Sequence, residues 1–274
     1  MPFHSNNWNW DRGKKSLRKY LRELNRRRDL LIYLVISGLK AQHRNTFLGY
    51  FWWLLDPLLG VVVYYFLVVI VLGRGGENYA PFLVIGLVVF RWLSSTVNTS
   101  AKSIVSKAGI ITQVYLPKAI FPFGASLTQL INFSFGLVVI AIFLAFFRIV
   151  PGKEVIWLPF IMIIQLLFHM AISLILGYIC VFIRDIENIT THLMRIMRYA
   201  SPVIWQKNML PADYQWISRV NPFSHLLTAY RNVLMYNALP DFNKLLVLGG
   251  VSLVIIIFML YFYSKNEHKI IKVL

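Results

Sequence analysis

Four charged residues interrupt stretches of this sequence that are otherwise apolar. Arg195 and Arg198 stand three positions apart in THLMRIMRYASPVIW, so in a helix both lie on one face. Asp56 and Arg91 each interrupt another apolar stretch. A charged side chain at the centre of a bilayer costs about 2.5–3.5 kcal/mol on insertion scales, so such residues normally face a partner or a cavity. The four residues are therefore the first candidates for a functional site.

Three interpretations of the two arginines are open. A rise of 1.5 Å per residue places Asp56 and Arg195 both about 12 Å from the cytoplasmic side, so they could form a structural ion pair. Alternatively, Arg195 or Arg198 lines a conduit and binds anionic groups, because the planar guanidinium suits phosphate oxygens and stays charged. In the third interpretation, both arginines snorkel to the inner membrane surface.

Aromatic residues are dense near the same stretches and include Trp52, Trp53 and Tyr199. Such residues commonly form interfacial belts or pack between helices. The functional alternative is stacking on sugar rings along a transport path. Trp52 and Trp53 stand near the expected inner mouth and are the best candidates for this role.

The sequence shows no motif for metal binding, disulfide formation or ATP binding. The histidines are scattered and the chain has one cysteine, Cys180, so neither a metal site nor an intramolecular disulfide is predicted. The G-x-x-x-x-G-K-[ST] loop that cradles ATP phosphates is also missing from the sequence. We therefore expect no cofactor on this chain.

The composition is that of a membrane protein. The chain is 58% hydrophobic and 14% charged, whereas a soluble domain carries roughly 25% charged residues. A bilayer span needs about 20 apolar residues. Six stretches fit: 48–72, 79–100, 119–147, 157–183, 187–206 and 245–263. The sequence predicts an all-α membrane protein with six transmembrane helices.

The distribution of lysine and arginine along the chain predicts the orientation of the protein in the membrane. Most of them precede the first span, lie in 101–118 or follow the last span, and fewer, including Arg231, fall in the other connections. Basic residues collect on the cytoplasmic side, so both termini are expected to be cytoplasmic and the protein to lie in the plasma membrane. The net charge of +17 fits topology and lipid contact. No nucleic-acid-binding module accompanies it, so no nucleic acid is expected.

The predicted spans divide the chain into three parts. Residues 1–46 form a cytoplasmic segment whose stretch 14–40 reads as an amphipathic helix at the inner membrane surface. Residues 47–264 form the six-span domain, and 265–274 form a cytoplasmic tail. Between the fifth and sixth spans, apolar residues at helical spacing predict an outer re-entrant helical hairpin at 207–240. These apolar residues are Phe223, Leu226, Leu227, Tyr230 and Leu234.

Three stretches resemble the permease subunits of bacterial polysaccharide-export ABC transporters. They are NTFLGYFWWLLDPLL, LVIGLVVFRWLSSTVNTSAKSIVSKAGIITQVYLPKAIFP, and RDIENITTHLMRIMRYASPVIW followed by VNPFSHLLTAYRNVLMY. The resemblance covers about residues 28–265 and is closest to teichoic acid translocation permeases, with O-antigen export permeases as near relatives. Asp56 and Arg91 depart from the family pattern, which usually has uncharged residues there.

The resemblance implies a non-enzymatic half-transporter. Two copies would form a homodimer and bind two copies of a separate subunit that carries ATP and magnesium. The cargo would be an anionic, lipid-diphosphate-linked polymer moved from the inner to the outer leaflet. Teichoic acid is the first expectation, and O-antigen or capsular polysaccharide is the alternative.

The same resemblance places the helix that couples to the ATPase at 103–115, in a connection too long to be a turn. The residues expected to carry this contact are Ser103, Ile104, Val105, Lys107, Ile110, Ile111, Gln113 and Tyr115.

Two other classes of membrane protein are alternatives to the exporter. A membrane glycosyltransferase would need acidic or histidine residues clustered at one membrane face, and here only Asp185 and Glu187 stand close together. An exporter of small drugs would fit the fold. Transport of small cations, however, is hard to reconcile with arginines along the path.

Overall fold

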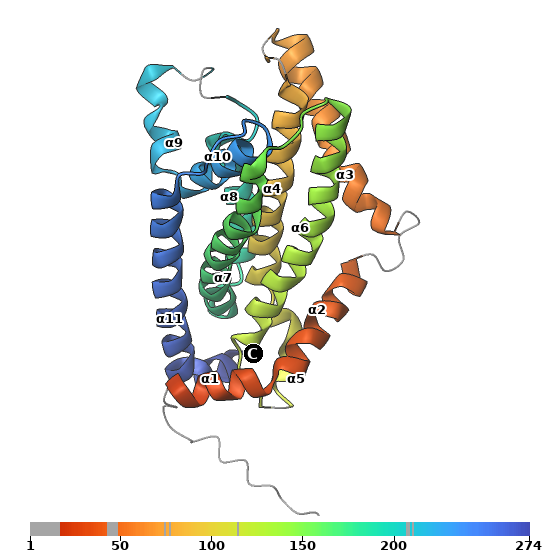
Figure 1. Cartoon of the computed structure of the whole chain (residues 1–274). Helices are drawn as coiled ribbons and strands as arrows, with labels where there is room; N and C mark the ends of the chain where they lie inside the picture. The colour runs from red at the N-terminus through yellow and green to blue at the C-terminus, as the bar shows by residue number, and fades with distance from the viewer. Residues whose placement is uncertain are drawn as a thin grey trace, which may run out of the picture.

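The computed structural model describes residues 17–42, 49–73, 75–76, 78–113, 115–206, 209 and 211–274. Within these ranges the regular structure is helical and contains no strand. Four of the described helical segments are long and apolar enough to cross a membrane: α4 (Tyr79–Ala101), α6 (Ile120–Phe146), Lys153–Phe182, which joins η4 (Lys153–Trp157) to α7 (Leu158–Phe182), and α11 (Phe242–Val273). They run side by side along the molecule (Figure 1). An all-helical membrane protein is confirmed, and the six-span topology stays a prediction.

The first predicted span, 48–72, is helical over 49–71. It consists of η1 (Gly49–Phe51), α3 (Trp52–Tyr65) and a π-helical stretch, η2 (Phe66–Val71). Its apolar part, Leu55–Val71, is shorter than that of the four long helices. α3 packs against α4 and α6.

The fifth predicted span ends earlier than expected. α8 (Ile186–Ala200) stops before Pro202, and Ser201 is extended with ψ at 152°. Proline disfavours helical geometry in the residue before it, which explains the stop. Residues 201–204 continue as buried, non-helical backbone. The prediction of one helix over 187–206 is therefore wrong in its last part.

Arg231 of α10 (Pro222–Leu234) holds the backbone that leaves α8. Its Nη1 donates to the carbonyl of Pro202 at 2.5 Å, and its Nη2 donates to those of Val203 and Phe82 at 3.1 Å. Buried carbonyls without helical partners need such donors, because lipid supplies none. The sequence placed Arg231 among the charges of an outer loop. The structure instead buries it, at 4% exposure.

The segment between α8 and α11 contains η6 (Ala212–Tyr214), α9 (Trp216–Val220) and α10. The five apolar residues singled out by their helical spacing in α10 are all buried. α10 packs against α4, α7 and α9. The predicted helix is confirmed here, and its depth in the membrane stays a prediction.

Two helices replace the single amphipathic helix expected at 14–40. α1 (Leu17–Arg26) and α2 (Arg28–Gln42) are separated by a turn at Arg27, and residues 14–16 lie outside the described residues. α1 lies across the end of the bundle where α11 finishes, and α2 rises along α6 (Figure 1). Both helices therefore pack on the bundle, and a position at the inner membrane surface stays a prediction.

Small and polar residues join the long helices. Ser100 of α4 and Ser126 of α6 both donate to the hydroxyl of Ser173 of α7, at 2.8 Å each. A Cβ on Gly177 of α7 would lie 2.7 Å from the ring of Pro122. Close approach and interhelical hydrogen bonds are the usual means of helix association in membranes.

The predicted coupling segment lies at the same end as α1 and the C-terminus (Figure 1). It forms a 3₁₀ turn, η3 (Val105–Lys107), and a one-turn helix, α5 (Ala108–Ile111), rather than one helix over 103–115. Ile104 and Ile111 are buried, whereas Ile110 and Gln113 are exposed. α11 continues through the expected C-terminal tail to Val273, and the cytoplasmic position of this tail stays a prediction.

Candidate functional site

An ion pair joins α3 to α4. Arg91 Nη2 donates to Asp56 Oδ2 at 2.6 Å, with the two side chains 43% and 38% exposed. The proposed pair between Asp56 and Arg195 is therefore wrong, since Arg195 lies on the exposed side of α8. The sequence placed Asp56 and Arg195 at similar distances from the cytoplasmic side of the membrane. This distance does not determine which neighbouring helix the side chain of Asp56 faces.

The ion pair lines a cavity of about 550 Å³ between α3, α4 and α6. Three of the predicted substrate-path residues, Trp52, Asp56 and Arg91, belong to its wall. The rest of the wall mixes hydroxyl, amide, ammonium and aromatic groups. Its other polar members are Ser95, Asn98, Thr99, Lys102, Gln129 and Asn132.

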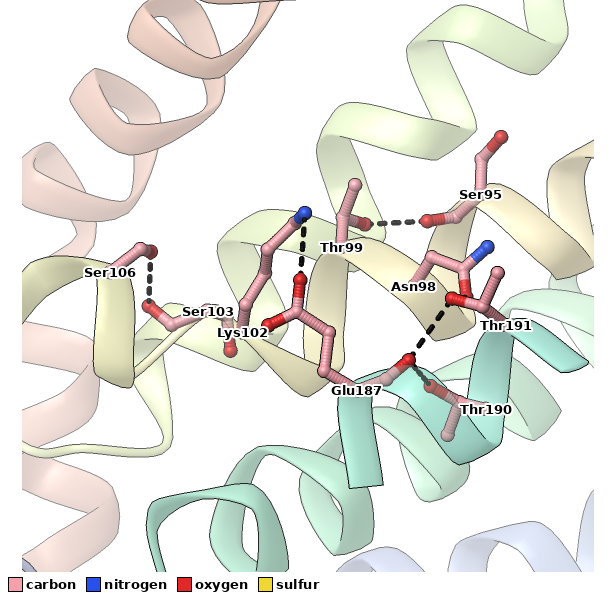
Figure 2. Close-up of polar contacts among 9 residues, drawn as sticks. All are labelled: Ser95, Asn98, Thr99, Lys102, Ser103, Ser106, Glu187, Thr190 and Thr191. Atoms are coloured by element: carbon pink, nitrogen blue, oxygen red, sulfur yellow. Dashed lines mark hydrogen bonds and ion pairs between the residues drawn. The ribbon is translucent and has the colours of Figure 1, made fainter. Parts of the chain in front are cut away.

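The second cation of the wall is paired as well. Lys102 Nζ lies 3.2 Å from Glu187 Oε1 in the first turn of α8. Figure 2 shows this ion pair beside Thr191, whose Oγ1 donates to the backbone carbonyl of Glu187 at 3.0 Å and lies 3.4 Å from Asn98 Oδ1. These contacts tie the start of α8 to the end of α4, close to where the coupling segment begins.

Trp92 closes the apolar side of the cavity. Its ring stacks on Phe133 with centroids 4.3 Å apart and meets His169 edge to face at 4.7 Å. Trp92 is 2% exposed, and within the described part of the chain its indole N–H has no hydrogen-bond acceptor. Two amide side chains of the wall are hydrogen-bonded to each other, because Asn132 Nδ2 donates to Gln129 Oε1 at 2.9 Å. The cavity thus offers both an aromatic floor and hydrogen-bonding groups.

No metal centre is found in the described ranges, which contain no group of three or more His, Cys, Asp or Glu side chains able to hold one. The cavity wall offers hydrogen-bonding, aromatic and charged groups.

Comparison with known proteins identifies the family. Residues 29–235 match the ABC-2 type transporter family. The chain belongs to this family. It is therefore a membrane permease subunit, the non-catalytic transmembrane component of such a transporter.

Three relatives match this ABC-2 permease over nearly its full length. The O-antigen export system permease protein RfbA of Myxococcus xanthus is 31% identical over 240 residues, covering 87% of this chain and 92% of the relative. Two RfbA permeases of Klebsiella pneumoniae are 26% and 27% identical over 247 residues, each covering 90% of this chain and 95% of the relative.

Three of the remaining predicted path residues of the ABC-2 permease lie on α8 and are not part of the cavity wall. Arg195 and Tyr199 are exposed, and Arg198 is half-buried with its guanidinium 5.4 Å from the centre of the Phe90 ring. The side chain of Trp53 lies outside the described residues. A role in the transport path stays a prediction for all four.

The sequence reasoning missed most of the cavity's polar wall, although a signal for it was present. Arg91, Ser95, Asn98 and Lys102 recur at intervals of four, three and four, which places them along one face of α4. Of these four residues, which form a polar stripe on α4, only Arg91 was predicted to belong to the substrate path.

Proposed function

We propose that the chain is the membrane subunit of an ATP-driven exporter of a lipid-linked, O-antigen-like polysaccharide. The observation that carries this proposal is the match to three O-antigen export permeases over 87–90% of the chain. The sequence alone put teichoic acid first and O-antigen second. The relatives favour the second, so we adopt the O-antigen-like polymer.

The proposed assembly is a homodimer with two copies of a separate ATP-binding subunit that carries ATP and magnesium. Both chain termini would be cytoplasmic. The clustering of α1, the coupling segment and the end of α11 at one end of the bundle supports this orientation (Figure 1). Exposed Ile110 and Gln113 give the coupling segment a surface for the ATPase. Membrane lipids would surround the long helices.

Arg195 is the proposed contact for the anionic lipid diphosphate. It shares the exposed side of α8 with Ile189, Leu193 and Ile196. No ion pair of Arg195 is found in the part of the chain that the structure describes. A cation facing lipid in this way is costly, so a polar conduit formed with a second protomer is the more favourable surrounding.

The experiment changes Arg195 and Arg198 to Ala, separately and together, and co-purifies each variant with its ATPase. We expect assembly and basal ATP hydrolysis to survive and stimulation by lipid-linked polysaccharide to be lost. R195K should retain part of the stimulation, because it keeps the charge without the bidentate geometry. I196A, on the same exposed side, is the matched control. Normal stimulation in the double variant would contradict the assignment.

A second experiment tests the coupling segment. I110E places a charge on its exposed surface and should weaken co-purification of the ATPase. K153E, an exposed charge change in η4, is the control and should leave co-purification intact. Full ATPase binding and export by I110E would contradict the proposed contact.

A further inference from the structure

We propose that the cavity between α3, α4 and α6 binds an uncharged sugar ring of the exported polymer, within a single protomer. This inference rests on the proposed function and adds to it. It assigns the sugar part of the substrate to the cavity and leaves the diphosphate to another site.

Charge pairing argues for an uncharged ligand. The two cations of the wall, Arg91 and Lys102, are each matched by a carboxylate, at 2.6 Å from Asp56 and 3.2 Å from Glu187. A phosphate entering here would have to displace a carboxylate that already holds the cation. A sugar needs no such exchange, because its hydroxyls both donate and accept hydrogen bonds.

The polar wall has the groups that bind hydroxyls. Asn98, Gln129 and Asn132 each carry an amide that accepts at its oxygen and donates twice at its nitrogen. Ser95 adds a hydroxyl between Arg91 and Asn98 on the same face of α4. Neighbouring sugar hydroxyls present alternating donors and acceptors, which such a wall can match.

The aromatic residues supply the other half of a sugar site. Trp52 and Trp92 both line the cavity, and Trp52 is only half-buried, so its ring offers flat apolar surface to the C–H face of a pyranose. The buried indole N–H of Trp92, a residue of the same wall, has no acceptor among the described residues. A buried donor left without an acceptor is unfavourable, and a sugar hydroxyl would satisfy it.

Size and position agree with this assignment. The volume of about 550 Å³ falls within the range of roughly 300–1,000 Å³ typical of small-ligand sites. It therefore suits one or a few sugar units rather than a folded polymer. Lys102 ends α4 immediately before the coupling segment, so an occupied cavity would lie next to the surface proposed for the ATPase.

Photo-crosslinking in inverted membrane vesicles tests the proposal. The vesicles come from cells that make the lipid-linked polysaccharide, and a benzophenone amino acid replaces Ser95 or Gln129. We expect a glycan-bearing adduct at these positions and none at Ile142, an exposed position on α6 outside the cavity wall. An adduct at Tyr199 but at neither cavity position would overturn the inference and leave the export function standing. Adducts nowhere, together with unchanged surface polysaccharide in a strain lacking the permease, would defeat both.

Competition separates a sugar site from an anion site. Methyl glycosides of the polymer's sugars should lower the adduct at Ser95, and excess inorganic pyrophosphate should not. Loss of the adduct with pyrophosphate alone would overturn the assignment to an uncharged sugar. W92F keeps the stacked ring and loses the N–H donor, so it should lower the adduct at Ser95 about fivefold while leaving any adduct at Tyr199 unchanged. An unchanged yield at Ser95 in W92F would remove Trp92 from the site.

Discussion

Lys118, in the turn between the coupling segment and α6, forms a buried ion pair with Glu267 near the end of α11. Their Nζ and Oε1 atoms lie 3.1 Å apart, with side-chain exposures of 0% and 8%. Tyr20 of α1 joins the same cluster, because its hydroxyl accepts a hydrogen bond from the backbone N–H of Ala119 at 3.2 Å. Burial raises the pKa of Tyr20 well above its usual value, so it stays neutral. Three elements far apart in the sequence are thus held together where the ATPase is proposed to bind.

Removing one member of this pair should be costly. K118M leaves the Glu267 carboxylate buried without its cation, and we expect a loss of about 3–5 kcal/mol in the free energy of unfolding. K118M/E267L removes both charges and should recover most of that loss. Thermal unfolding of the purified permease checks both variants. Equal destabilisation of the single and double variants would show that shape, and not charge, accounts for the contact.

For the Asp56–Arg91 pair, too, the single variant should lose more unfolding free energy than the double variant, but the loss should be smaller. D56N leaves an arginine with no counter-charge at its previous distance, and we expect a loss of about 1–2 kcal/mol because both side chains are partly exposed. The double variant D56N/R91Q should be more stable than D56N. A double-mutant cycle measured by thermal unfolding gives the coupling, and a coupling of zero would contradict the ion pair.

Arg231 should tolerate no replacement well. R231M removes all three hydrogen bonds to the carbonyls of Pro202, Val203 and Phe82, and we expect a loss of about 3 kcal/mol or more in unfolding free energy. R231K keeps the charge but lacks the fork that reaches several carbonyls, so it should recover only part of the loss. Limited proteolysis between residues 201 and 206 should accelerate in both. Full recovery in R231K would mean that charge alone matters.

The start of α11 should weaken in acid. Asp241 accepts from the backbone N–H of Lys244 at 3.2 Å and pairs with its Nζ at 2.8 Å. These contacts, with the positive field of His225 as a smaller cause, lower the pKa of Asp241 below its usual value. Its contribution to stability is therefore complete above the unfolded pKa of about 3.9 and is lost as pH falls through the lower folded value. Between pH 6 and pH 3 the wild type should lose more thermal stability than D241N. Parallel curves for the two would contradict the shift.

Hydropathy and apolar spacing predicted the long helices and α10 correctly. Each of these patterns is contained within one continuous stretch of the sequence, so it can be read without knowing how the helices pack. The partner of Asp56 could not be predicted in this way, since it depends on how α3 is rotated against α4. The polar stripe from Arg91 to Lys102 was readable from its spacing. What the sequence could not show is that α6 adds Gln129 and Asn132 to the same cavity.

The role of Arg231 could not be predicted from the sequence, for a different reason. A lone arginine between two spans looks like a topological charge, and nothing nearby in the sequence pairs with it. Its role arises only because α8 ends before Pro202 and frees carbonyls on a segment about 30 residues away in the chain. Three-dimensional packing was needed to bring the donor and its acceptors together.

The most direct test of the central claim is the location of lipid-linked polysaccharide in a strain that lacks this permease. The account predicts that the polymer is made but stays on the inner leaflet, protected from glycosidase added to intact spheroplasts, and that the wild-type gene restores exposure. I110E should not restore it, whereas K153E should. Polysaccharide that reaches the outer surface normally without the permease would contradict the account.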